Sequence, residues 1–449
     1  MSSAPPGWAS LGLAEVVSLK TGPFGSALHK SDYVTGGIPL INPSHIRNGR
    51  LDSDPNVSVD AKAKERLSEY CLRENDVVMG RRGEMGRCAV VNLEAAGWLC
   101  GTGSVIVRPS PAIQAPFLQR FLSAPATVET LNGDSVGSTM VNLNQGVLLG
   151  LPIELPPLNE QQRIANKLDT VLARVDACRD RLARVAPLLK RFRQSVLAAA
   201  TSGRLTEDWR DAARISWRPA RRTLADVAEV VTGSTPSKKE PANFGDAVPF
   251  FKPSDLDQGY AVAEASEYLS ATGARLARML PAQTVLVTCI GATIGKTGLA
   301  RVSCTTNQQI NALVARSTIV VPGWLYFWCC SPIGQQSIVE NSSATTLPIL
   351  NKSRFSALEA DVPSLAEQAE IIRRVETLFA YADRLEARLA QAQAAVNRLT
   401  PSLLAKAFRG ELVPQDPADE PAAELLKRLA ASRTAPVAKT RKPRQGQAA

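Results

Sequence analysis

The stretch LPIELPPLNEQQRIANKLDTVLARVDA at residues 151–177 returns at residues 358–384 as LEADVPSLAEQAEIIRRVETLFAYADR, 207 positions later. Other segments agree at nearly the same offset, including TMVNLN at 139 with TLPILN at 346 and LAEVVSLKTG at 13 with LADVAEVVTG at 224. A repeat with this period indicates two copies of one structural unit. Each copy is a domain of roughly 150 residues followed by a segment of different character.

The segment that follows each domain is predicted to be helical, because its apolar residues alternate in steps of four and three. A seam of two apolar residues per heptad favours pairing of the two helices over packing of each on its own domain, which would need a third apolar position. The seam residues are Ile164, Leu168, Val171, Val175, Cys178, Leu182, Val185, Leu189, Phe192 and Val196 in the first copy, and Ile371, Val375, Leu378, Ala382, Leu385, Leu389, Ala392, Val396, Leu399 and Leu403 in the second.

Both helices also carry predicted start and stop residues: capping boxes at Asn159 with Gln162 and at Ser364 with Glu367, and left-handed stops at Gly203 and Gly410. A helix over residues 159–203 would be about 65 Å long at 1.5 Å per residue. Pro187 and Pro401 are potential kinks, since each removes one backbone hydrogen bond.

The repeated domains have the composition of mixed α/β structure. Short apolar stretches such as DVVMG, SVIVRP, TVLVTCI and INALVAR alternate with Gly, Pro and Asn turns and are predicted strands. PFLQRFLSAP and WLYFWCCSP are predicted short helices. We therefore expect five segments: domain 1 over residues 1–157, a central helix over 158–203, domain 2 over 204–362, a C-terminal helix over 363–410 and an extension over 411–449 that ends in a partly disordered basic tail.

Charge and composition limit the class of protein. Lys and Arg outnumber Asp and Glu by 52 to 42, and the net charge of +10 suggests an acidic partner such as nucleic acid. The eight cysteines form no CxxC pair and only two histidines are present, which argues against a zinc site or a disulfide framework and favours the cytoplasm. No run of 18 apolar residues is present, so no membrane span is expected.

Two short motifs resemble catalytic loops but lack essential residues. CIGATIGKTG at 289–298 resembles a phosphate-binding loop, yet Gly291 stands one residue too close to Gly295, and its counterpart RRGEMGR at 81–87 has no Ser or Thr after the basic residue. NPSH at 42–45 lacks the second proline and the aromatic residue of an amino-methyltransferase loop. With no catalytic triad or metal cluster in view, we expect no enzymatic activity.

The combined pattern resembles the specificity subunit of type I restriction–modification systems. Both copies begin with a tryptophan before an L-A-[ED]-V motif, and both carry a TG turn, a Gly-rich basic turn (RGEMGR and GATIGK) and the same helix start (LPPLNEQQRIANKLD and VPSLAEQAEIIRRVE). The resemblance covers residues 1–412 or so, and the proline-rich basic end lies outside it. One departure is that residues 1–159 carry 13 basic and 14 acidic side chains, so domain 1 is not net basic.

This resemblance implies two target-recognition domains joined by two long helices that form an antiparallel coiled coil. It implies that the chain binds a bipartite, asymmetric site in double-stranded DNA and positions two methyltransferase subunits and the restriction subunits. S-adenosylmethionine, ATP and Mg²⁺ would belong to those partners, and this chain itself would hold no cofactor. The bases that are recognised and the spacing between the half-sites do not follow from the sequence.

The residues expected to contact DNA have side chains of the types that bind phosphates or base edges. The candidates are Lys20, Asn42, His45, Arg47, Arg81, Arg82 and Arg87 in domain 1, and Lys238, Lys239, Lys252, Lys296, Asn307, Gln308 and Gln309 in domain 2. The polar cluster TTNQQIN at 305–311 could equally be a hydrogen-bonded turn. Two alternatives remain at this point: a coiled-coil protein scaffold without sequence-specific DNA binding, and an NTPase that uses the loop at 289–298.

Overall fold

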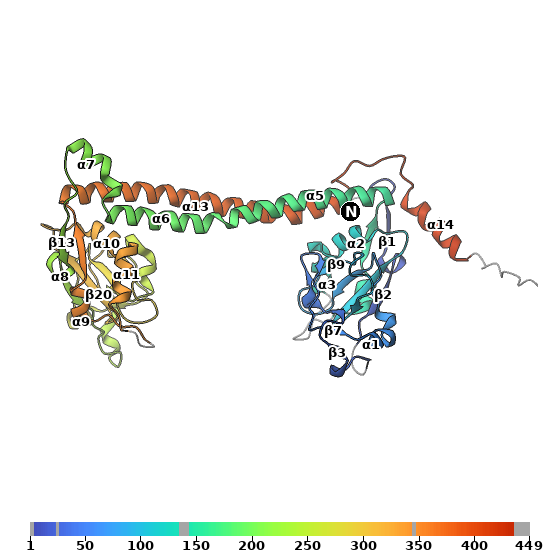
Figure 1. Cartoon of the computed structure of the whole chain (residues 1–449), viewed down its shortest axis with the longest axis horizontal. Helices are drawn as coiled ribbons and strands as arrows, with labels where there is room; N and C mark the ends of the chain where they lie inside the picture. Colours follow the sequence, from blue (N-terminus) through green and yellow to red (C-terminus); the bar gives the residue numbers. More distant parts are fainter. Residues whose placement is uncertain (1–3, 24–26, 134–142, 344–346, 435–449) are drawn as a thin grey trace, which may run out of the picture. The chain divides into compact units, whose positions relative to one another are not determined.

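The computed structural model describes residues 4–23, 27–133, 143–343 and 347–434. The chain divides into two compact units, one formed by Met1–Arg181 with Ala392–Ala449 and the other by Leu182–Gln391 (Figure 1). Each unit contains one copy of the repeated domain together with helical segments from both spacer regions. Among the described residues, no helix combines the length and the apolar character needed to cross a membrane.

The domain of the first unit is built on two four-stranded sheets. One sheet is antiparallel, in the order β2 (Val17–Thr21), β11 (Ser104–Pro109), β8 (Val77–Gly80) and β9 (Cys88–Val90). The other runs β10 (Leu99–Cys100), β4 (Ile38–Ile41), β7 (Ser58–Val59) and β3 (Tyr33–Val34). The remaining strands are the pairs β1 (Ala9–Gly12) with β12 (Pro152–Leu155) and β5 (Ile46–Arg47) with β6 (Arg50–Leu51). Helices connect the strands: η1 (Leu13–Glu15), η3 (Lys30–Asp32), η4 (Pro43–His45), α1 (Ala61–Arg66), η5 (Ser68–Tyr70), α2 (Ala115–Leu122), α3 (Pro125–Gly133) and α4 (Gln145–Leu149).

The domain of the second unit repeats the strand order of the main sheet, and its second sheet has three strands instead of four among the described residues. Its main sheet is β14 (Ala228–Thr232), β20 (Ile310–Ala315), β17 (Val285–Thr288) and β18 (Thr297–Leu299), and its second sheet is β16 (Tyr268–Leu269), β15 (Phe244–Phe251) and β19 (Thr305–Thr306). β13 (Ala220–Thr223) pairs with β21 (Glu359–Val362), as β1 pairs with β12. The helices are η6 (Arg204–Thr206), α7 (Glu207–Ala213), α8 (Leu224–Val227), η7 (Pro241–Asn243), η8 (Asp255–Ala261), α9 (Ala271–Leu276), α10 (Pro322–Cys330), α11 (Pro332–Glu340) and α12 (Lys352–Ser356). The predicted mixed α/β duplication is therefore confirmed.

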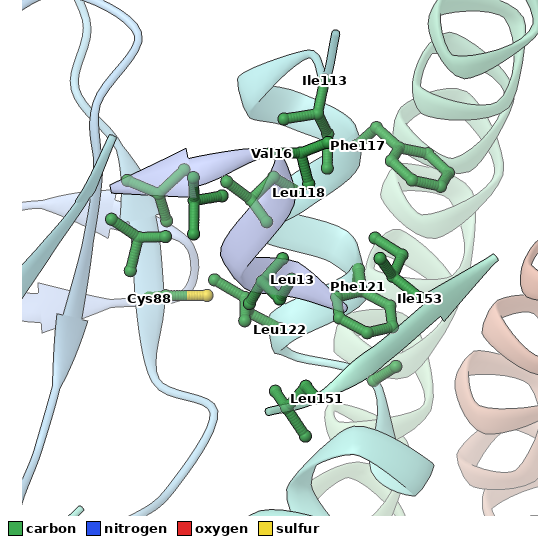
Figure 2. Close-up of a cluster of buried hydrophobic side chains, with 14 of the residues drawn as sticks. Leu13, Val16, Cys88, Ile113, Phe117, Leu118, Phe121, Leu122, Leu151 and Ile153 are labelled. Carbon is green, nitrogen blue, oxygen red and sulfur yellow. The ribbon is translucent and has the colours of Figure 1, made fainter. Parts of the chain in front are cut away.

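The core of the first domain continues into the long helices. In β8 the alternating side chains Val77 and Met79 face one cluster and Val78 faces another, so the sheet is buried on both sides. Figure 2 shows the first cluster, in which Phe117 and Phe121 of α2 lie among apolar side chains from several elements. Both rings make edge contacts with Phe408, at centroid distances of 5.6 and 5.7 Å. This packing joins the domain to the end of a spacer helix.

The long helices are α5 (Leu158–Ala183), α6 (Val185–Thr201) and α13 (Leu365–Phe408). In the first unit α5 lies alongside the C-terminal part of α13, and in the second unit α6 lies alongside its N-terminal part (Figure 1). In the second unit Arg193 of α6 pairs with Asp383 of α13 at 2.6 Å. Arg210, which follows α6 in the chain, pairs with Glu367, which precedes Asp383 in α13. The chain from α6 onward therefore runs antiparallel to α13.

The predicted seam is correct in most positions and wrong in two. Cys178 and Leu399 are exposed. A strict seven-residue count does not follow the drift of about 20° per heptad of a straight α-helix. The expected single helix is interrupted at Arg184, three residues before Pro187, whose ring nitrogen cannot donate to the carbonyl of residue 183. Pro401 lies inside α13 without ending it.

The predicted helix ends are partly confirmed. Gly203 and Gly410 adopt left-handed φ values of 76° and 73°, as expected for glycine stops. The Asn159 box is wrong, because α5 begins at Leu158 and Asn159 is therefore inside the helix, where its amide donates to Asp419 at 3.0 Å. At the second start Ser364 accepts the backbone N–H of Glu367 at 3.3 Å, but the carboxylate of Glu367 binds Arg210 and Thr206 rather than closing a box.

Part of the C-terminal extension packs on the first domain. The N–H of Ala422 donates to the carbonyl of Gly7 at 2.9 Å, and Asp419 forms an ion pair with Arg163 at 2.7 Å. Helix α14 (Ala422–Thr434) then buries Leu425, which is 3% exposed, in the core of the first domain. The extension is therefore a structural part of the first unit up to residue 434, and the basic tail over 435–449 lies outside the described residues.

We expect Leu425→Ala to lower the free energy of unfolding of the first unit by about 2 kcal/mol, since it removes a buried leucine from a helix docked on the core. Lys427→Ala, in the same helix with a side chain 73% exposed, is the matched control and should change stability by less than about 0.5 kcal/mol. Urea denaturation monitored by Trp fluorescence measures both. Equal midpoints for the two variants would contradict docking of α14.

Candidate nucleic-acid interface

In domain 1, three turns that follow strands of the two sheets meet in one place. They comprise residues 42–47, 81–87 and 101–103, which we call the first turn cluster. Backbone bonds hold it together: the N–H of Arg81 donates to Gly103 O at 2.8 Å, and that of Gly101 donates to Ile41 O at 2.8 Å. A guanidinium nitrogen of Arg87 also reaches Pro43 O at 3.5 Å. The turns are thus fixed relative to one another by the sheet ends.

In domain 2 the equivalent turns comprise residues 252–257, 289–296 and 307–309, the second turn cluster. The N–H of Cys289 donates to Gln309 O at 2.7 Å, and that of Asn307 donates to Phe251 O at 3.2 Å, as in the first cluster. Residues 233–235 lie against it, since the N–H of Ser234 donates to Thr306 O at 2.9 Å.

The loop that resembles a nucleotide site has no free backbone amides at the critical positions. The N–H of Gly295 donates to Thr288 O at 2.8 Å, that of Lys296 to Thr293 O at 3.1 Å, and that of Gly291 to Pro348 O at 3.0 Å. A phosphate-binding loop needs such groups to point at the ligand. This stretch is therefore a closed turn, with Gly291 and Gly295 in left-handed conformations at φ 103° and 87°.

The first turn cluster carries four arginines, of which Arg47 and Arg82 are exposed and Arg81 and Arg87 are partly buried. Arg82 is exposed and has no hydrogen-bond or ion-pair partner among the described residues. Arg81 donates from Nε to Leu143 O at 3.0 Å, and partial burial, with a smaller contribution from the neighbouring charge of Arg82, lowers its pKa. Arg47 is exposed and donates to Ser44 O at 3.0 Å.

Other candidates of domain 1 are occupied by neighbours. Arg87 pairs with Glu84 at 2.5 Å. His45 is 8% exposed, and its Nδ1 lies 3.1 Å from Leu40 O, so it positions the turn. Asn42 precedes the short helix η4, and its Oδ1 is buried without a partner among the described residues.

Lys20 lies outside the first turn cluster. Its ammonium pairs with Glu69 at 2.6 Å, and the hydrogen bond that it donates to this carboxylate raises the pKa of Lys20. The ammonium also lies 5.0 Å from the centre of the Tyr70 ring.

In domain 2 the polar side chains gather on the turn at 307–309. Gln308 is exposed, and its carboxamide oxygen accepts a hydrogen bond from the hydroxyl of Thr235 at 2.5 Å. Asn307 is 9% exposed and donates to the side-chain oxygen of Gln309 at 2.8 Å, so its main contact is internal.

The lysines of domain 2 occupy three different settings. Lys252 pairs with Glu267, and Lys296 pairs with Asp257 at 2.7 Å. Lys238 and Lys239 are exposed in the loop after β14, and within the part of the chain that the structure describes no carboxylate pairs with them. These two are the most accessible cations of the predicted set in domain 2.

The sequence-based choice omitted a groove in the first unit. This arginine groove has a volume of about 1050 Å³ and lies between the 46–49 and 83–88 segments, α2 and the long helices, with Arg47, Arg87 and Arg120 in its wall. An adjoining hollow of about 810 Å³ adds Arg50. The only signal that could have found Arg50 and Arg120 is the repeat itself, because the equivalent positions of domain 2 are Tyr260 and Phe327.

In domain 2 aromatic rings fill the corresponding space. Tyr260 stacks on Phe327 at 4.9 Å and contacts Tyr326 at 5.1 Å, and Phe327 contacts Phe379 of α13 at 6.0 Å. The hydroxyl of Tyr260 also donates to Glu376 of α13 at 2.8 Å. The two domains therefore present the same turns but attach to their helices differently.

Comparisons with known proteins give a consistent result. Residues 5–185 and 220–393 match the model of the type I restriction modification DNA specificity domain. The specificity subunit of the type I restriction enzyme EcoBI from Escherichia coli is 34% identical over 436 residues, covering 89% of this chain and 87% of the relative. The EcoKI specificity subunit from Escherichia coli strain K12 is 29% identical over 454 residues, covering 96% of each.

Solved structures agree at the level of the fold. The crystal structure of the HsdS subunit from Thermoanaerobacter tengcongensis matches 92% of this chain and 99% of its own with a TM-score of 0.61 at 21% identity. A chain from a structural study of complex assembly and conformational transition of the type I restriction–modification system matches 92% of this chain with a TM-score of 0.66 at 19% identity. The chain thus belongs to the type I restriction–modification specificity subunit family, and its role is that of a DNA sequence-specificity subunit.

Proposed function

We propose that this chain binds one split site in double-stranded DNA, with each domain contacting one half-site, and that it has no catalytic activity of its own. The proposal includes two methyltransferase subunits and restriction subunits as partners in the cytoplasm. S-adenosylmethionine, ATP and Mg²⁺ would be bound by these partners. Support comes from the family and from relatives described as subunits of type I restriction enzymes.

The observation that carries the two-part site is the pair of turn clusters. Their backbones are held by equivalent hydrogen bonds, yet their exposed side chains differ, with Arg82 on one and Gln308 on the other. Two equal frames with different polar groups suit two different half-sites. If the chain were a protein scaffold without DNA specificity, the different exposed side chains of the two turn clusters would have no function. The comparisons with known proteins do not favour this alternative.

The proposal is tested by expressing the chain with its methyltransferase partner in a host that lacks other adenine methylation. Sequencing that detects methylated adenines should then show one split, non-palindromic sequence. The chain alone should neither methylate nor cleave DNA. Methylation of no defined sequence by the assembled complex would contradict the proposal.

We expect the double variant Lys238→Ala/Lys239→Ala to weaken DNA binding by the assembled complex about 5- to 10-fold without changing the recognised sequence. Both side chains are exposed and unpaired within the described residues, as expected of phosphate contacts. Fluorescence anisotropy over a salt series should show the slope of log K against log salt reduced by about 2. Lys406→Ala/Lys427→Ala, outside both turn clusters, is the control, and an equal effect there would rule out a local contact.

A further inference from the structure

The two turn clusters share one backbone frame, which allows their positions to be matched one to one. Three pairs of equivalent hydrogen bonds establish the match. Arg81 N to Gly103 O (2.8 Å) corresponds to Cys289 N to Gln309 O (2.7 Å). Leu143 N to Arg81 O (2.9 Å) corresponds to Leu350 N to Cys289 O (2.8 Å), and Gly101 N to Ile41 O (2.8 Å) corresponds to Asn307 N to Phe251 O (3.2 Å). We call 81–87 and 289–296 the hairpin turns, and 101–103 and 307–309 the facing turns.

Polar side chains are distributed in opposite ways over this common frame. In domain 1 the hairpin turn begins with two arginines, and the facing turn is Gly-Thr-Gly. In domain 2 the hairpin turn begins with Cys289 and Ile290, and the facing turn is Asn-Gln-Gln. The long polar side chain of the domain 2 hairpin turn, Lys296, is paired with Asp257. Among the described residues, the exposed long polar side chains without an ion pair are therefore Arg82 on the hairpin turn of domain 1 and Gln308 on the facing turn of domain 2.

Packing restricts two of the three positions of the facing turn in domain 1. A Cβ on Gly101 would lie 2.2 Å from Oδ1 of Asn42 and 2.9 Å from Ile41 O, so the turn cannot carry a side chain there. Gly103 has φ +84°, which disfavours any other residue. In domain 2 the residue equivalent to Asn42 is Lys252, whose ammonium pairs with Glu267.

The exposed groups differ in hydrogen-bonding chemistry. Arg82 is exposed, carries donors only, and has no partner among the described residues. Gln308 is exposed, and its amide carries donors beside an oxygen with a second lone pair, the first being used by Thr235. Two parallel donors match the two acceptors O6 and N7 of guanine, whereas one donor with one acceptor matches N7 and N6 of adenine.

We propose that domain 1 recognises a guanine of its half-site through Arg82 on the hairpin turn, and that domain 2 recognises an adenine of the other half-site through Gln308 on the facing turn. This rests on the proposed function, because it assumes that the turn clusters face DNA. A base undergoing methylation leaves the duplex. The adenine bound by Gln308 is therefore expected at a position other than the methylated one.

The test compares methylated sequences for complexes that contain the natural chain, Arg82→Ala, Arg82→Lys, Gln308→Ala or Arg73→Ala. Arg73 is an exposed arginine four residues before strand β8, outside the first turn cluster, and serves as the control. We expect Arg82→Ala to reduce the preference for one guanine about 10- to 100-fold and to leave the other half-site unchanged. Arg82→Lys should also lose preference, since an ammonium lacks the bidentate geometry.

Gln308→Ala should relax one adenine in the opposite half-site, and Arg73→Ala should change nothing. The unaffected half-site in each experiment shows that the complex is assembled and folded. Reduced methylation at an unchanged sequence would mean a phosphate contact and would overturn the proposal, as would relaxation at a different base. Absence of any split methylated sequence with the natural chain would instead refute the proposed function.

Discussion

Glu367→Gln should lower the free energy of unfolding of the second unit by about 3 kcal/mol, whereas Glu160→Gln, at the equivalent position of the first unit, should cost less than about 1 kcal/mol. Glu367 is 4% exposed, and its carboxylate binds Arg210 at 2.5 Å and the hydroxyl of Thr206 at 2.7 Å. A neutral amide would leave Arg210 buried without its counter-charge, which is the costly way to break a buried pair.

Glu160 is as deeply buried as Glu367, at 1% exposed, but has a different neighbourhood. One carboxylate oxygen accepts the indole N–H of Trp8 at 3.0 Å, and the other has no partner among the described residues. Burial raises the pKa of Glu160, and the bond from Trp8 only partly opposes this. Glutamine can keep the bond from Trp8 while removing a charge that is costly to bury.

The raised pKa of Glu160 also determines the sign of its contribution to the pH dependence of stability in the first unit. The folded chain holds this proton more tightly than the unfolded chain, so ionisation of Glu160 destabilises the first unit at high pH, and this cost disappears as the pH falls through the folded and then the unfolded pKa. Stability of the first unit should therefore fall less steeply with acidification in the natural chain than in Glu160→Gln.

Urea denaturation at pH 7 and pH 5 measures these effects. Tryptophan fluorescence follows each unit, through Trp8 and Trp98 in the first and Trp209, Trp217, Trp324 and Trp328 in the second. Equal losses from the two glutamine variants would show that the ion pair of Glu367 contributes no more than the lone carboxylate of Glu160.

Phe327→Ala should destabilise the second unit by about 3 to 4 kcal/mol. Phe327 is 2% exposed and touches Tyr260, Tyr326 and Phe379, so its removal leaves a cavity between the domain and α13. Arg120, its equivalent in the first unit, lies in an open groove and pairs with the exposed Asp169 at 2.7 Å. Arg120→Ala should cost less than about 1 kcal/mol.

Calorimetry of both variants against the natural chain checks this difference. The midpoint of the transition that belongs to the second unit should fall by several degrees in Phe327→Ala. A comparable fall in the transition midpoint of the first unit in Arg120→Ala would mean that packing around Arg120 closes the arginine groove and stabilises that unit. Arg120 and Phe327 occupy equivalent positions of the two domains, so each variant is the control of the other.

The duplication and the long helices could be predicted because both are written in periodic patterns. The strands β8, β11, β17 and β20 followed from their apolar runs, and all four are observed. Periodicity is local, however, and could not show that Cys178 and Leu399 are exposed. It also could not show that α14 packs on the first domain, since the contact of Asp419 with Arg163 joins residues 256 positions apart.

For the candidate site, residue type and turn residues were predictable, but burial was not. His45 and Asn307 have the same chemistry as exposed candidates, and only the fold shows that their polar atoms are used internally. The arginine groove was invisible to motif reasoning because Arg50 and Arg120 belong to no motif. Which DNA bases are bound depends on side-chain direction, which a linear pattern does not carry.

The division of the chain into units has a consequence for synthesis on the ribosome. The second unit is one uninterrupted segment, Leu182–Gln391, whereas the first combines Met1–Arg181 with Ala392–Ala449. Vectorial synthesis thus completes the second unit as soon as residue 391 has emerged. The first unit begins the chain, but its core also contains residues of α14 and of the end of α13. It can therefore complete its fold only after the second unit has been synthesised.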